Sequence, residues 1–158
     1  MDSGTRTGLY FGTTSGVITT LGVIVGLNAG TESLAAVIGG ILVIAVADAM
    51  SDALGIHLAQ ESDANASSRQ VWAATFSTFL AKFLTALSFT LPFVLAAPNV
   101  AILISIVWGY LIICLLSYRL ASEQSLKPLN VIFEHVAIAT IVIIASHAIG
   151  LWVRETIG

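Results

Sequence analysis

Five long apolar stretches, separated by short polar segments, decide what this chain of 158 residues can fold into. A helix needs about 20 mostly apolar residues to cross about 30 Å of hydrocarbon. The stretches that meet this length are Leu9–Leu27, Leu34–Leu58, Val71–Leu95, Val100–Tyr118 and Val131–Val153. Inside a bilayer the backbone must satisfy its own hydrogen bonds, so we expect each stretch to be helical. The sequence therefore predicts an all-α, polytopic membrane protein with five transmembrane helices in a single transmembrane domain over residues 1–158.

Composition agrees with this class and excludes others. Charged residues make up 9% of the chain, against about 25% in soluble domains. The net charge of −3 leaves no basic patch for nucleic acid. A single cysteine, Cys114, cannot form a disulfide or a cysteine-based zinc site within one chain. Because no phosphate loop, nucleophile elbow or H-E-x-x-H sequence is present, we expect no enzyme and no cofactor.

Basic residues predict the orientation in the membrane. With five spans, the two termini lie on opposite sides. If the N-terminus is cytoplasmic, four basic residues fall inside and only Arg154 falls outside. The four are Arg6, Arg69, Arg119 and Lys127. The positive-inside rule thus predicts a cytoplasmic N-terminus and an outside or lumenal C-terminus, in the cell membrane if the source is prokaryotic.

Four ionisable side chains fall inside the apolar stretches, where each costs at least about 2.5–3.5 kcal/mol. They are Asp48, Asp52, Lys82 and Glu134. Asp48 and Asp52 are four residues apart, which places both carboxylates on one helix face. Two such negative charges repel each other unless a cation or a proton intervenes.

Oxygen groups of other helices are expected at a similar depth. At about 1.5 Å per residue, Asp52 lies about 9 Å and Asp48 about 15 Å from the inner end of their helix. Ser15, with Thr14 beside it, lies about 9 Å inside the first helix, and Glu134 lies near the inner end of the fifth. We expect a polar cavity that opens inward. Carboxylate and hydroxyl ligands suit Mg²⁺, Ca²⁺ or Mn²⁺, and also Fe²⁺.

Lys82 allows two interpretations of the acidic pair. Its ammonium can act as an internal counter-ion for Asp48 when no metal is present, so that cation, proton and ammonium compete for one place. The alternative is a purely structural ion pair that holds helices together. A second group, His57 and Glu61, is also spaced i and i+4 and predicts either an entry site for a cation or only a solvated helix end.

Glycines recur every four residues in the first stretch. One row contains Gly12 and Gly16, and another contains Gly22, Gly26 and Gly30. Small residues let membrane helices approach closely. The rows therefore predict either close packing within one chain or the seam of a homodimer.

Two segments resemble the vacuolar iron transporter family. Phe11–Thr20 reads FGTTSGVITT where family members typically read G-A-N-D-G-L-V-S-T. Ala47–Leu58 reads ADAMSDALGIHL where they read A-G-A-I-S-M-A-x-G-E-Y-x-S. The resemblance implies a five-helix homodimer, with the first helices near the two-fold axis, that exports Fe²⁺ or Mn²⁺ from the cytosol in exchange for protons.

The resemblance also marks departures. Ser15 stands where the family has a path-lining aspartate, and Asp52 stands where it has a methionine. Asp48 occupies another path-lining position one turn earlier. The Glu-rich metal-binding helices that many members insert between the second and third spans are replaced by the short segment Gln60–Gln70.

We therefore expect a homodimeric transporter of a divalent metal cation, Fe²⁺ or Mn²⁺ in type, with proton antiport. Its site would contain Asp48, Asp52, Ser15, Thr14 and Glu134, with Lys82 for proton coupling. The alternative from another class is a non-transporting transmembrane scaffold or partner subunit, derived from a transporter fold, in which the charges only hold helices together.

Overall fold

The computed structural model describes residues 2–157, and within them five helices are long and apolar enough to cross a membrane. They are Ser3–Thr31, Leu34–Glu61, Ser68–Leu95, Pro98–Glu123 and Pro128–Thr156. All five predicted spans are therefore confirmed as helices. Each extends past at least one predicted end, to 26–29 residues. At 1.5 Å per residue this is about 39–44 Å, the thickness of a bilayer with its headgroups.

Two of the five spans are divided into shorter elements. The first span is α1, Ser3–Thr31. The second contains α2, Leu34–Val43, η1, Ile44–Asp48, and α3, Ala49–Glu61. The third contains α4, Ser68–Ser88, and α5, Thr90–Leu95. The last two are α6, Pro98–Glu123, and α7, Pro128–Thr156.

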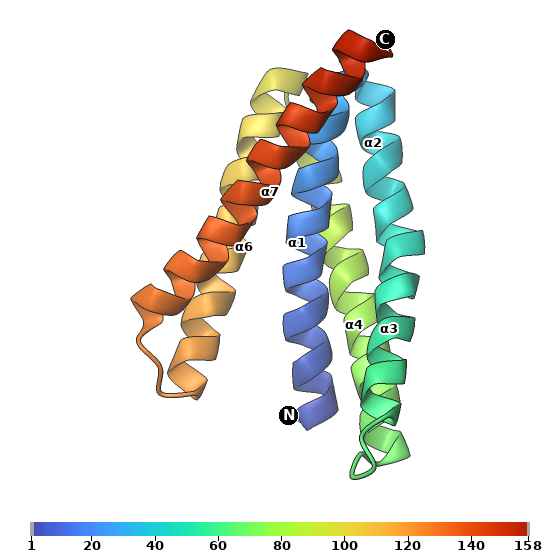
Figure 1. Ribbon diagram of the computed structural model, residues 1–158, viewed down its shortest axis with the longest axis vertical. Coiled ribbons are helices and arrows are strands. Elements are labelled where there is room, and N and C mark those ends of the chain that lie inside the picture. Colours follow the sequence, from blue (N-terminus) through green and yellow to red (C-terminus); the bar gives the residue numbers. More distant parts are fainter. Residues whose placement is uncertain (1, 158) are drawn as a thin grey trace.

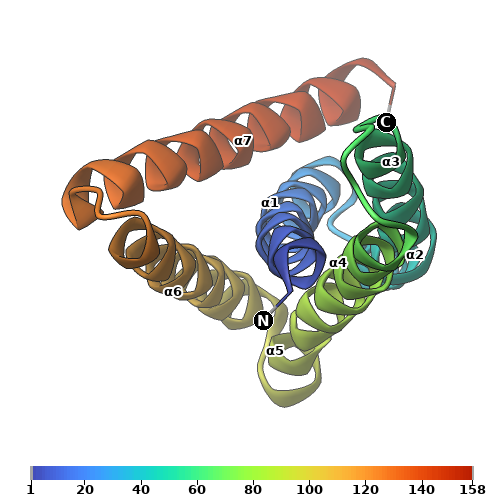
Figure 2. The same cartoon turned by 90° about the horizontal axis from the view of Figure 1, so that it is seen from below.

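Successive spans run in opposite directions, and α1 lies among the others (Figures 1 and 2). It contacts α2, α4, α6 and α7 and reaches η1 and α3. The end at which α1 begins, α3 ends and α4 begins is called here the N-terminal end. Arg6, Arg69, Arg119 and Lys127 all belong to segments at this end, and Arg154 to the opposite one.

Glycines of α1 allow the close contact with α4. A Cβ atom on Gly12 would lie 2.5 Å from the carbonyl oxygen of Thr78, and one on Gly16 would lie 3.1 Å from the Cβ of Thr85. The row continues toward the start of the helix with Gly4 and Gly8, which meet the backbone of α4. Without side chains at these positions the two backbones approach, as small residues permit in membrane helices.

The second glycine row of α1 faces α7. Gly22 and Gly26 pack against Ser146, and Gly30 packs against Gly150. Both rows thus contact helices of the same chain. Gly22, Gly26 and Gly30 also line an apolar groove of about 510 Å³ between α1 and α7, so the homodimer seam stays a prediction.

A π-helical turn at Ile44–Asp48 interrupts the second span. Buried residues follow each other in steps of four along this span: Val37, Ile41, Ala45, Ala49 and Ala53. In an α-helix of 3.6 residues per turn, each step of four drifts about 40° around the axis. The wider π turn offsets part of this drift. The alanines, and the aspartates near them, therefore stay on the side that faces α1 and α4.

Pro92 explains the break in the third span. Proline has no N–H for the carbonyl of the residue four positions earlier, and its ring clashes with that carbonyl. Here that residue is Ser88, where α4 ends. Helical geometry resumes at Thr90, with the Phe89 N–H donating to the Ala86 carbonyl over 3.1 Å. Pro92 thus accounts for the division of this span into α4 and α5.

Candidate functional site

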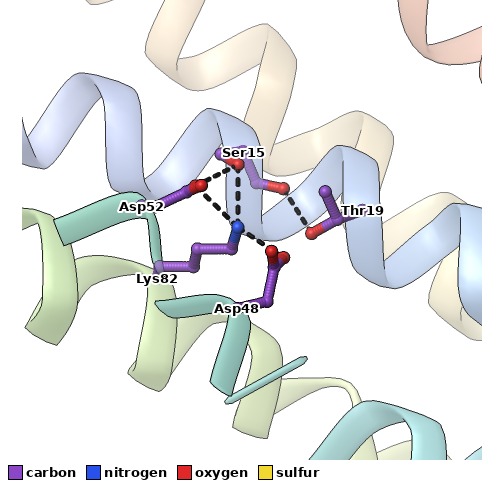
Figure 3. Close-up of polar contacts among 5 residues, drawn as sticks. All are labelled: Ser15, Thr19, Asp48, Asp52 and Lys82. Carbon is purple, nitrogen blue, oxygen red and sulfur yellow. Dashed lines mark hydrogen bonds and ion pairs between the residues drawn. The ribbon is translucent and has the colours of Figure 1, made fainter. Parts of the chain in front are cut away.

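The ammonium of Lys82 is the centre of a polar cluster between α1, η1, α3 and α4 (Figure 3). Its Nζ lies 2.5 Å from the Oδ2 of Asp48 and 2.6 Å from the Oδ2 of Asp52. Lys82 has no exposed surface. The sequence predicted the pairing of Lys82 with Asp48, and the structure adds an equally short contact with Asp52.

Ser15 connects α1 to this cluster. Its hydroxyl donates to the Oδ2 of Asp52 over 2.6 Å and accepts from the Nζ of Lys82 over 3.0 Å. One turn further on, the hydroxyl of Thr19 donates to the carbonyl oxygen of Ser15 over 2.8 Å. Three oxygens, one each from α1, η1 and α3, therefore surround one positive charge.

Local structure explains why these side chains meet. Asp48 ends the π turn and Asp52 lies one α-helical turn beyond it, so both carboxylates project from one face. Gly16 brings α1 close to Lys82 and Thr85 of α4. The lysine side chain is thereby enclosed between α1 and α3, with its nitrogen at the level of Ser15.

The charges in the cluster do not balance. Two carboxylates share one ammonium, so the ionised cluster keeps one excess negative charge. Exposure is also uneven, because the Asp48 side chain is 37% exposed and that of Asp52 is 20% exposed. The surroundings of the protein therefore reach the cluster at the two carboxylates and not at Lys82.

Lys82 lies between the carboxylates of the acidic pair, where we expected a cation. The ammonium is fully buried there, whereas both carboxylates remain partly exposed. The physical reason is the cost of burying unpaired charge, which a partner within hydrogen-bonding distance reduces. Within residues 2–157 no three His, Cys, Asp or Glu side chains are grouped closely enough to hold a metal ion.

Two of the predicted site residues lie elsewhere. Thr14 is on a different face of α1 from Ser15 and lines a cavity of about 260 Å³ next to Ser117 and His135. Glu134 is exposed on the first part of α7, which packs beside α6 and away from α3 (Figure 1). The structure therefore brings together Asp48, Asp52, Lys82 and Ser15, and leaves Thr14 and Glu134 apart.

His57 and Glu61 form a separate group where α3 meets the start of α4. The Nδ1 of His57 lies 2.9 Å from the Oγ1 of Thr75, and its Nε2 lies 3.9 Å from the Oε2 of Glu61. The His57 side chain is 18% exposed and Glu61 66%. His57 is thus held within the protein, and only Glu61 has the exposure of a solvated helix end.

Sequence reasoning missed two features of these sites. The π turn has no proline or glycine inside it that would mark it. The contact of Ser117 with His135, 2.8 Å long, joins residues of two helices whose register cannot be read from one sequence. The bond of Thr19 to the Ser15 carbonyl, in contrast, follows from their spacing of four residues in one helix.

Five long apolar helices make the chain an integral membrane protein, and its distinguishing feature is a buried lysine held by two carboxylates and a hydroxyl. Comparisons of the chain with protein-family models, with curated proteins and with solved structures give no match.

Proposed function

We propose that the protein is a transporter that moves a divalent metal cation across the membrane through the site at Asp48 and Asp52. The observation that carries this proposal is the position of the Lys82 ammonium, which contacts both carboxylates and Ser15 at once. A small cation at the same position would contact the same three oxygens. Carboxylate and hydroxyl oxygens are ligands of hard divalent cations and also serve Mn²⁺ and Fe²⁺.

The charge of the cluster supports an exchange of cations. An entering divalent ion replaces the ammonium between Asp48 and Asp52 and neutralises both carboxylates. When the ion leaves, Lys82 returns and keeps the empty site paired, which avoids two uncompensated charges in the membrane. In this scheme Lys82 is the internal counter-ion of the transport cycle.

The remaining parts of the proposal rest on the resemblance to the vacuolar iron transporter family and on the basic residues. These are a cytoplasmic N-terminal end, export of Fe²⁺ or Mn²⁺ from the cytosol, exchange against protons, and a homodimer. Four basic residues at the N-terminal end support the orientation. Gly22, Gly26 and Gly30 line an apolar groove between α1 and α7, and the proposed homodimer uses this groove or another surface of the helices.

Metal flux into proteoliposomes tests the proposal. We expect the protein to carry Mn²⁺ or Fe²⁺ with an opposing proton flux, and we expect Asp52→Asn to abolish both. Asp63→Asn is a matched control, because Asp63 is an exposed carboxylate that binds only the neighbouring Asn65 in its turn. Flux that is equal in the two variants would place the cation path elsewhere, and no flux in the wild type would reject transport of these ions.

A second function is favoured by one specific observation, the complete burial of Lys82. In a transmembrane scaffold or partner subunit, the cluster would only tie α1, α3 and α4 together. This alternative predicts that Asp52→Asn lowers thermal stability and leaves the effect of every cation unchanged. The transporter predicts a higher melting temperature with at least one of Mn²⁺, Fe²⁺, Ca²⁺, Mg²⁺ and Zn²⁺, and loss of this rise in Asp52→Asn, because a ligand of the folded state stabilises it.

A further inference from the structure

The contacts of His57 determine which of its ring nitrogens carries the proton. The Oγ1 of Thr75 donates its only proton to the carbonyl oxygen of Val71 over 2.8 Å. The same oxygen lies 2.9 Å from the Nδ1 of His57. A hydroxyl that keeps its proton on the Val71 carbonyl accepts from His57, so these contacts favour the tautomer with the proton on Nδ1. In the neutral ring the lone pair is then on Nε2.

This lone pair faces an acceptor. The Nε2 of His57 lies 3.9 Å from the Oε2 of Glu61, one turn along α3. Two acceptors at this distance need a hydrogen-bond donor or a cation between them. A proton on Nε2, a water that donates to both atoms and a metal ion that both atoms ligate each meet this need.

We infer that His57 and Glu61 bind a divalent transition metal ion at the junction of α3 and α4. Metal to imidazole nitrogen is about 2.0–2.1 Å and metal to carboxylate oxygen about 2.0–2.2 Å for zinc. At a tetrahedral angle, donor atoms at these distances from the metal lie about 3.4 Å apart. Nε2 and Oε2 are 3.9 Å apart on the same helix, so a small rotation of the exposed Glu61 side chain brings both to one ion. A histidine that binds a metal through one ring nitrogen usually forms a hydrogen bond through the other, which orients the ring. Thr75 is this partner for the Nδ1 of His57.

A hollow beside the pair provides room for the other ligands. Its volume is about 110 Å³, and it is lined by His57, Glu61, Ala66, Ser68, Val71 and Trp72. Water molecules there complete the coordination, since two protein ligands leave open positions. The mixed nitrogen and oxygen set selects Ni²⁺, Cu²⁺, Zn²⁺ or Fe²⁺ over Mg²⁺ and Ca²⁺.

This site is independent of the proposed transport site. Asp48 and Asp52 offer only oxygens and contact Lys82, whereas His57 contacts Thr75 and Trp72, nearer the start of α4. The two sites therefore differ in metal preference. Loss of one leaves the other intact.

Trp72 makes the site measurable, because its ring centroid lies 4.8 Å from that of His57. The test uses the full chain in detergent with Trp108→Phe and Trp152→Phe, so that Trp72 is the only indole. Added Ni²⁺, which quenches nearby indoles, should reduce its emission in a saturable way, and Zn²⁺ should restore the emission by competition. Mg²⁺ should have no effect.

Three variants decide the assignment. His57→Gln and Glu61→Gln should each raise the Ni²⁺ concentration needed for half-maximal quenching by about tenfold or more. Loss of a residue that only supports a metal ligand already costs about tenfold in affinity, and loss of the ligand itself should cost at least as much. Glu61 is exposed, so its substitution tests the site even if the His57 variant folds poorly. Asp52→Asn should leave the quenching unchanged whether or not the protein transports metal. The inference is wrong if Ni²⁺ does not quench saturably, if Glu61→Gln has no effect, or if Asp52→Asn removes the quenching.

Discussion

Lys82 and Asp52 are joined twice, directly by an ion pair of 2.6 Å and through the hydroxyl of Ser15, which accepts from one and donates to the other. These contacts connect α4 to α3 and both to α1. Every substitution in the cluster therefore has a cost in stability as well as any effect on ion passage.

Lys82→Gln should be strongly destabilising. It leaves Asp48 and Asp52 one turn apart without a counter-charge, and removing one partner of a buried ion pair costs about 3–5 kcal/mol. The partial exposure of both carboxylates reduces this cost, so we expect about 2–4 kcal/mol. Chemical denaturation in a fixed detergent measures it.

The matched control for this variant is Lys127→Gln, because Lys127 is exposed at the start of α7 and makes no ion pair within residues 2–157. It should change stability by less than about 0.5 kcal/mol. The double variant Lys82→Gln with Asp52→Asn should recover part of the lost stability, because a smaller excess charge remains. Equal stability of the two lysine variants would contradict the cluster.

Ser15→Asp tests the charge of the same cluster from α1. A third carboxylate beside Asp52 raises the excess negative charge, so the cation-free protein should lose stability through repulsion. A divalent cation then gains a ligand, and Mn²⁺ should raise the melting temperature more than in the wild type. Ser15→Ala serves as the control, since it removes both hydrogen bonds of the hydroxyl without adding charge. If Mn²⁺ affects the aspartate and alanine variants alike, the cation does not bind at this cluster.

The number and type of helices could be predicted from sequence because both follow from length and hydropathy, which are local properties. The break before Pro92 also has a local cause, because the missing N–H of a proline leaves the carbonyl four residues earlier without its helical hydrogen bond. The predicted helix ends were less accurate, because helices such as α1 continue for several residues beyond the apolar stretch from which they were predicted.

The candidate site was predictable only in part. The i, i+4 spacing of Asp48 and Asp52 placed them on one face, and the scarcity of opposite charges identified Lys82 as their partner. Depth alone suggested Thr14 and Glu134, but depth does not determine the rotation of a helix about its axis. Thr14 faces Ser117, and Glu134 is exposed on α7, because the packing of α6 and α7 sets those rotations.

Ser67→Ala should destabilise the start of α4. The Ser67 hydroxyl accepts from the backbone N–H of Gln70 over 3.4 Å, and the Gln70 side chain accepts from the backbone N–H of Ser67 over 2.9 Å, which is a capping box. Loss of such a cap costs about 0.5–2 kcal/mol. Ser68→Ala, one residue along and inside the helix, should be nearly neutral. Faster hydrogen exchange at the first turn of α4 in the Ser67 variant alone would support the prediction, and equal exchange in both would oppose it.

Gly12→Ala and Gly55→Ala should change stability in opposite directions. A Cβ on Gly12 would lie 2.5 Å from the carbonyl oxygen of Thr78, a backbone atom that cannot move without shifting α4. We expect a loss of about 1–3 kcal/mol from this overpacking. Gly55 is also inside a helix, but a Cβ there meets nothing within 4 Å, so alanine should add about 0.5–1 kcal/mol through its lower conformational freedom. Because both changes add the same single carbon to a helical glycine, their difference measures the contact between α1 and α4. A gain in stability at both positions would mean that α1 and α4 are further apart than in the structure. The enclosure of the Lys82 side chain, which depends on the close approach of α1, would then be contradicted.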